Sequence, residues 1–188
     1  MVQKRAEMNF VDGYNCCQSV VLAFEDCLFM TGEEGCGAGE KPVPREVLVA
    51  MSSGFGGGMG RMREVCGAVS GMVTMAGFIK PSDDPSDMGR RTENYALVQE
   101  FAVKFREAKG SIICRELLAL AKERREAEGK AAPAAATTAT DHAAATAKRE
   151  MEAPRPSERT PEYYRTRPCT LQVGTAARIV ADYLLSHA

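Results

Sequence analysis

Residues 61–79, RMREVCGAVSGMVTMAGFI, decide the fold of this chain. They are apolar around most of a helical circumference, which is typical of a helix at the centre of a domain. Their uncharged part, residues 65–79, is fifteen residues long, whereas a membrane span takes about 20. We therefore expect a buried central helix around which the other segments pack.

The segments on either side place apolar residues at helical spacing and show almost no alternation with period two. Asn15 is expected to cap a helix over residues 16–30, and Gly110 to end a helix over residues 86–109. Further helices are expected over residues 6–11, 44–51 and 114–120 and after Pro168. The sequence therefore predicts an all-α fold, a compact helical bundle of about five to seven helices.

The composition changes sharply at Lys122. Between residues 131 and 147, ten residues are Ala and four are Thr, and three prolines follow between residues 154 and 161. A segment without large apolar side chains has nothing to bury, so we expect residues 122–161 to be a flexible, disordered linker. Residues 1–121 would then form a helical core, which a helix within residues 162–188 completes as part of the same domain.

Charge and length exclude several classes of protein. The 188 residues, 45% of them hydrophobic, suit one domain, and 24 Lys and Arg against 25 Asp and Glu leave a net charge of −1. This balance indicates neither a nucleic-acid partner nor binding to an anionic membrane. The N-terminal residues lack the apolar run of a secretory signal, so a cytoplasmic location is expected.

Seven cysteines are an odd number, which disfavours a fully paired disulfide framework and points to metal or redox chemistry in a reducing compartment. No CxxC spacing occurs, so a shared site would have to be assembled by the fold. Four dispersed cysteines are candidates: Cys16, Cys66, Cys114 and Cys169. All but Cys66 are expected at helix starts, where the helix dipole favours thiolate, the form that binds metals and attacks disulfides. The alternative is that each is a small buried hydrophobic residue.

Cys66 is expected inside the central helix, where Gly67, Ala68 and Gly71 follow at spacings of three and four. They form a smooth face that serves either helix packing alone or a group lying beside Cys66. The preceding run GFGGGMG, residues 54–60, fits neither GxGxxG nor GxxxxGK[ST], so no nucleotide cofactor is expected. Its glycines, including Gly56, Gly57 and Gly58, either let a ligand approach the backbone or only make a tight turn.

Several motifs together resemble the family of redox-active proteins named for its C_GCAxxG_C_C cysteine pattern. They are GYNCCQSV at residues 13–20, the glycine run at 54–60, CGAVSG at 66–71, CRELL at 114–118, and Cys169. The resemblance implies that Cys16, Cys66, Cys114 and Cys169 are the four family cysteines of a small helical protein with a redox role. Two departures are Cys17, where the family usually has a small residue such as Ala, and the long linker.

We therefore expect a redox or electron-transfer protein whose four cysteines converge. They would hold an iron–sulfur cluster or form a reversible dithiol/disulfide centre, served by a redox partner protein or an oxidoreductase or transport system. The alternatives are a structural zinc site, an enzyme with one activated cysteine at Cys16 or Cys169, and a helical adaptor. A homodimer is an allowed oligomeric state.

The remaining cysteines have separate expectations. Cys17 is an extra thiol that cannot point in the direction of Cys16, because adjacent helical residues lie about 100° apart. Cys27 is expected to pack on an apolar helix stripe, and Cys36 to lie exposed in a loop. Neither is expected to carry the function.

Overall fold

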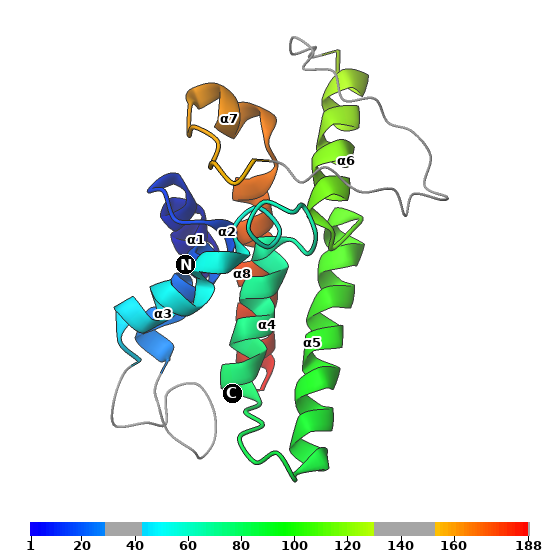
Figure 1. Ribbon diagram of the computed structural model, residues 1–188. Helices are drawn as coiled ribbons and strands as arrows, with labels where there is room; N and C mark the ends of the chain where they lie inside the picture. The colour runs from blue at the N-terminus through cyan, green and yellow to red at the C-terminus, as the bar shows by residue number, and fades with distance from the viewer. Residues whose placement is uncertain (29–42, 130–152, 188) are drawn as a thin grey trace.

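The computed structural model describes residues 1–28, 43–129 and 153–187, and these residues form helices joined by turns, with no β-strand among them (Figure 1). The α-helices are α1 (Val2–Val11), α2 (Cys16–Val21), α3 (Arg45–Ser52), α4 (Gly67–Ile79), α5 (Met88–Lys109), α6 (Cys114–Ala127), α7 (Pro161–Thr166) and α8 (Cys169–Ser186). Two short 3₁₀ helices, η1 (Leu22–Cys27) and η2 (Ser53–Phe55), follow α2 and α3. The all-α prediction is confirmed, and the described part has eight α-helices because the short α7 adds to the expected five to seven.

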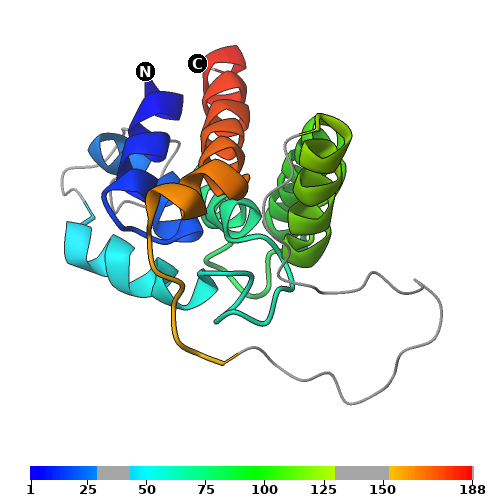
Figure 2. The same ribbon diagram turned by 90° about the horizontal axis from the view of Figure 1, so that it is seen from above.

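Helix α4 lies at the centre of the fold, in contact with α2, α5 and α8 (Figure 1). Met72, Met75 and Ala76 of α4 are completely buried. Viewed from above, α8 runs beside α1, while α5 and α6 stand on the other side of α4 (Figure 2). Segments from the two ends of the chain therefore pack in one core, to which α8 contributes the fully buried Val173 and Val180.

The central helix begins later than the sequence predicts, at Gly67 instead of residue 61. Arg61 and Arg63 adopt positive φ angles of 70° and 60°, which do not belong to a right-handed helix. Their segment instead folds back on the glycine run, where the Arg61 and Glu64 N–H groups donate to the carbonyls of Gly56 and Gly58. As a result, Cys66 is the N-cap of α4 and not an interior residue.

The helix predicted for residues 16–30 is also shorter. It ends at Val21 and continues as the 3₁₀ helix η1, while residues 29 and 30 lie outside the described residues. A 3₁₀ helix has three residues per turn, so the face presented to the core shifts relative to an α-helix. This shift corrects the expectation for Cys27, which is exposed and not packed on an apolar stripe.

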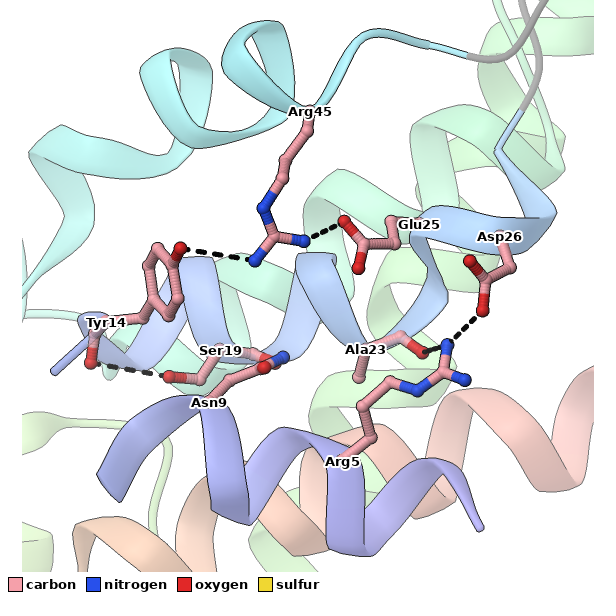
Figure 3. A network of polar contacts seen from close by, with 8 residues as sticks. All are labelled: Arg5, Asn9, Tyr14, Ser19, Ala23, Glu25, Asp26 and Arg45. Carbon is pink, nitrogen blue, oxygen red and sulfur yellow. Dashed lines mark hydrogen bonds and ion pairs between the residues drawn. The ribbon is translucent and has the colours of Figure 1, made fainter. Parts of the chain in front are cut away.

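Polar contacts hold this tighter turn against its neighbours (Figure 3). Arg5 of α1 pairs with Asp26 at 2.5 Å, and Arg45 of α3 pairs with Glu25 and donates to the Tyr14 hydroxyl at 3.1 Å. These contacts are largely exposed, so each contributes little to the free energy of unfolding. They orient η1 between α1 and α3.

Both ends of the predicted linker differ from the expectation, while residues 130–152 lie outside the described residues. Helix α6 continues past Lys122 to Ala127, because Lys, Glu, Arg and Ala are strong helix formers and Lys122 pairs with Glu126 at 3.7 Å. At the other end, the Arg159 guanidinium donates to the Phe10 carbonyl at 2.7 Å and lies 4.1 Å from the centre of its ring. Arg159 thus belongs to the folded domain.

Two glycines of α4 allow a direct test of its packing against α2. A Cβ on Gly71 would lie 2.7 Å from the Val20 Cβ, whereas a Cβ on Gly77 would meet nothing within 4 Å. We expect Gly71→Ala to lower the free energy of unfolding by about 1–2 kcal/mol, since the overlap outweighs the gain in helix propensity. Gly77→Ala, the matched control, is expected to raise it by up to about 1 kcal/mol. Urea unfolding measures both, and equal effects would contradict the close α2–α4 contact.

Candidate functional site: a cavity lined by four cysteines

Four helices begin at one cavity of about 70 Å³, and each brings a cysteine to it. Cys16, Cys114 and Cys169 are the first residues of α2, α6 and α8, and Cys66 is the N-cap of α4. Cys66 and Cys114 are buried, whereas Cys16 and Cys169 are half-buried. The structure therefore brings together the four cysteines that the sequence singles out, and it does so at four helix N-termini.

The backbone fixes Cys66 and Cys114 next to each other. The Cys114 N–H donates to the Glu64 carbonyl at 2.7 Å, and the Cys66 N–H donates to the Ile112 carbonyl at 2.9 Å. These bonds frame an isolated antiparallel bridge between Val65 and Ile113. Two segments that are about 50 residues apart are thus held in register just before α4 and α6 begin.

Asn15 is the N-cap of α2, as the sequence predicts, and it fixes the position of Cys16 through a capping box. Its side-chain oxygen accepts from the N–H groups of Cys17 and Gln18, and Gln18 accepts from the Asn15 N–H in return. The Asn15 amide group also donates to the Ser53 carbonyl at 2.9 Å. This side chain therefore ties the start of α2 to the end of α3.

Three of the glycines singled out in the sequence line the cavity: Gly57, Gly58 and Gly67. A Cβ on Gly58 would lie 2.7 Å from the Cys114 Cβ, and a Cβ on Gly67 would lie 2.9 Å from the Cys16 Cβ. These two positions let the cysteine-bearing segments approach closely. The other two glycines and Ala68 do not line it: Gly56 abuts Asn15, Gly71 abuts Val20, and Ala68 is buried in the core.

Cys16 and Cys169 both line the cavity, and the interaction between their thiols separates their pKa values. It raises the pKa of Cys16 well above its ordinary value, and burial adds to the increase. The same interaction lowers the pKa of Cys169 from 9.0 to about 7, with further help from the Arg167 charge, a hydrogen bond from Tyr163 and the Arg159 charge. The two shifts favour a Cys169 thiolate beside a protonated Cys16.

The other two cavity thiols stay protonated. Burial, followed by the nearby Cys114, raises the pKa of Cys66 to about 12. Burial also raises the pKa of Cys114, although the Arg63 guanidinium acts in the opposite direction. The four cysteines are thus not equivalent, and Cys169 is the one whose environment favours a nucleophile.

Sequence reasoning did not identify the cationic and aromatic side chains of the site. Arg63, Arg159, Arg167 and Tyr163 line the cavity together with the cysteines. The Arg159 and Arg167 guanidinium groups lie 5.3 Å and 5.2 Å from the centre of the Tyr163 ring. Arg159, Tyr163 and Arg167 lie in the segment that precedes Cys169, which was an available signal. The low-complexity stretch before this segment favoured a linker instead.

Cys17 does not line the cavity. It is completely buried within the core, and burial raises the pKa of its thiol to about 12 despite a hydrogen bond with Thr74. Its environment is that of a small packed side chain. Cys36 lies outside the described residues.

The cavity offers the donor atoms of a metal centre, although the described side chains are not arranged around one metal ion. Thiolates suit both iron–sulfur clusters and zinc. Among residues 1–28, 43–129 and 153–187, however, no three His, Cys, Asp or Glu side chains are grouped so that they could hold one metal ion.

Fold and site together define an all-α protein with a cavity of four cysteines at helix starts. The family model described as "Putative redox-active protein (C_GCAxxG_C_C)" matches residues 14–183, which is most of the chain. The chain belongs to this family, as its cysteine motifs predict. Comparisons with curated proteins and with solved structures give no match.

Some expectations from the sequence stay predictions. None of the described helices combines the length and the apolar character that crossing a bilayer requires. The cytoplasmic location, the homodimer and the redox partner are among these predictions.

Proposed function

We propose that this protein is a thiol–disulfide redox protein in which Cys169 and Cys16 form a reversible disulfide. The observation that carries the proposal is that Cys16 and Cys169, the first residues of α2 and α8, line one cavity, and their opposite pKa shifts support it. A nucleophilic thiol with a pKa near the ambient pH and a second thiol within reach are what disulfide exchange requires.

The exchange would take two steps. The Cys169 thiolate attacks one sulfur of a substrate disulfide, a new S–S bond forms, and the first substrate thiolate leaves and takes up a proton. Cys16 then loses its proton and attacks the Cys169 sulfur, which breaks the mixed disulfide and releases the second substrate thiol. The substrate gains two electrons from the two cysteine sulfurs and two protons, one from Cys16 and one that Cys169 had released to solvent, and the protein ends with a Cys16–Cys169 disulfide. A reducing dithiol partner reverses both steps.

The surrounding groups have defined roles in this proposal. Arg159 and Arg167 stabilise the Cys169 thiolate by charge, and Tyr163 stabilises it by a hydrogen bond. Arg159 is itself held by the carbonyls of Phe10 and Tyr14, so its charge is positioned by α1 and the turn after it. Cys66 and Cys114 keep their protons and line the rest of the cavity.

Disulfide mapping tests this proposal. Reduced protein is treated with one equivalent of diamide, the remaining thiols are blocked, and the digested peptides are identified by mass spectrometry. We expect one linked peptide pair containing Cys16 and Cys169, reversed by dithiothreitol, with Cys17 unlinked as an internal control. A disulfide between other cysteines, or none in folded protein, would contradict the proposal.

A second candidate is an iron–sulfur protein, and the observation that favours it is that all four cysteines line one cavity. Anaerobic purification followed by iron and sulfide analysis and visible spectroscopy separates the two candidates. Protein that stays colourless after cluster reconstitution excludes the cluster. Stoichiometric zinc in the same metal analysis would instead support a structural zinc site.

A further inference from the structure

A second, larger cavity of about 190 Å³ adjoins the cysteine cavity, with which it shares Leu117, Arg167, Pro168 and Gln172. It lies between the C-terminal half of α6, the end of α5, and the segment that joins α7 to α8. The function proposed above makes no use of this cavity.

The lining of this cavity carries only positive charges. No Asp or Glu is among its described lining residues, whereas five cationic side chains are: Lys109, Arg124, Arg125, Arg165 and Arg167. Favourable placement of cations at helix C-termini accounts in part for Lys109 in α5 and for Arg124 and Arg125 in α6. It does not account for their convergence on one concavity with two further arginines from another segment.

Two of the lining side chains have buried polar atoms without a partner among the described residues. The Nε and Nη1 atoms of Arg125 are buried and form no hydrogen bond, and the same holds for Oε1 of Gln172, a residue that is only 6% exposed. Burying a polar group without a partner is unfavourable, and more so when the group is charged. Such groups at the wall of a cavity indicate a ligand that satisfies them.

The charge of Lys109 is also unfavourable in the described structure. Burial lowers its pKa, and the nearby charges of Arg178 and Arg124 lower it further. An anion in the cavity would reverse this effect, since it would favour the protonated amine.

We propose that this cavity binds a small phosphorylated organic molecule. Guanidinium groups match the geometry of phosphate oxygens and bind them through two parallel hydrogen bonds. The wall also contains Leu117 and Leu120, and Leu171 at the rim is 63% exposed, so an apolar part of the ligand has a surface to cover. The concave shape favours a small molecule over a membrane surface or RNA, which would contact a convex basic face.

A ligand bound in this cavity would also affect the cysteine cavity, because Arg167 lines both. This arginine is one of the charges that stabilise the Cys169 thiolate, so a phosphate group that pairs with it would weaken that stabilisation. We expect bound phosphate to slow alkylation of Cys169. The binding site itself does not depend on disulfide chemistry at Cys16 and Cys169.

Isothermal titration calorimetry with phenyl phosphate tests the proposal, with inorganic phosphate as the comparison. We expect one saturable site per chain and tighter binding of phenyl phosphate, because of its apolar ring. Arg125→Gln should weaken binding at least tenfold. Arg106→Gln, in the last turn of α5 but outside the cavity, should leave binding unchanged.

Lys109→Gln serves as a second variant in case Arg125→Gln lowers the thermal unfolding temperature. We expect Lys109→Gln to weaken binding as well. Absence of saturable phenyl phosphate binding, or equal affinity in both cavity variants and the Arg106→Gln control, would overturn the proposal. Binding of phosphatidic acid vesicles or RNA without binding of phenyl phosphate would also overturn it. Failure of disulfide formation at Cys16 and Cys169 would leave these results unaffected, so the two proposals fail separately.

Discussion

The Cys169→Ser variant should form a mixed disulfide with a disulfide substrate at least 100-fold more slowly than the parent protein at pH 7. A thiol with a pKa of about 7 is about half ionised at this pH, whereas Cys66, with a pKa of about 12, is almost fully protonated. No other cavity thiol can therefore replace the nucleophile. The rate is measured with 5,5′-dithiobis(2-nitrobenzoic acid), in a background where Cys27 and Cys36 are serines, by release of the coloured thiolate.

Cys16→Ser serves as the matched control for this experiment. Serine keeps a hydroxyl donor for Cys169, so the first attack should proceed, but the mixed disulfide on Cys169 should persist because the second thiol is missing. Mass spectrometry then finds the reagent attached to Cys169. If Cys169→Ser reacts as fast as the parent protein, Cys169 is not the nucleophile.

The pH dependence gives an independent check on the Cys16–Cys169 interaction. The Cys169 thiolate is present above its pKa, so alkylation by iodoacetamide should rise with pH and reach half its maximum near pH 7. Cys16→Ala removes the thiol that contributes most to the low pKa, so the midpoint should move toward the ordinary value of 9.0. An unchanged midpoint in Cys16→Ala would show that the arginines and Tyr163 stabilise the thiolate without Cys16.

The sequence predicts the parts of this site that depend on local chemistry. Asn15 precedes Cys16 with Gln18 three residues later, which is a capping-box pattern that neighbouring residues alone satisfy. Gly110 likewise adopts the positive φ of 94° that ends α5. Such capping signals depend only on residues that are close in sequence, so a single sequence is enough to predict them.

The parts that the sequence does not predict depend on contacts between distant segments. Residues 61–65 are compatible with an extension of the central helix, but the segment bonds to the glycine run and to Cys114 and Arg115 instead. That alternative depends on a partner about 50 residues away, so helical periodicity could not exclude it. Arg159 is similar, since its binding to the Phe10 carbonyl spans nearly the whole chain.

Gly58→Ala should be among the most destabilising single substitutions in the loop that precedes α4. Gly58 is buried with a φ of 72°, and a Cβ there would lie 2.7 Å from the Cys114 Cβ and 2.9 Å from the Glu64 nitrogen. The left-handed backbone costs an alanine about 1–2 kcal/mol, and the overlap adds about 1–3 kcal/mol. We expect the free energy of unfolding in urea to fall by about 2–4 kcal/mol.

Gly60→Ala separates these two contributions. Gly60 has a similar φ of 55°, but a Cβ there would meet nothing within 4 Å, so only the backbone cost of about 1–2 kcal/mol is expected. Because the Cβ on Gly58 displaces Cys114, alkylation of Cys114 should become faster in Gly58→Ala and not in Gly60→Ala. Equal destabilisation and unchanged Cys114 reactivity would mean that the glycine run makes only a turn. A larger effect at Gly58 would mean that the absence of a side chain there leaves the space that Cys114, at the start of α6, occupies beside the cavity.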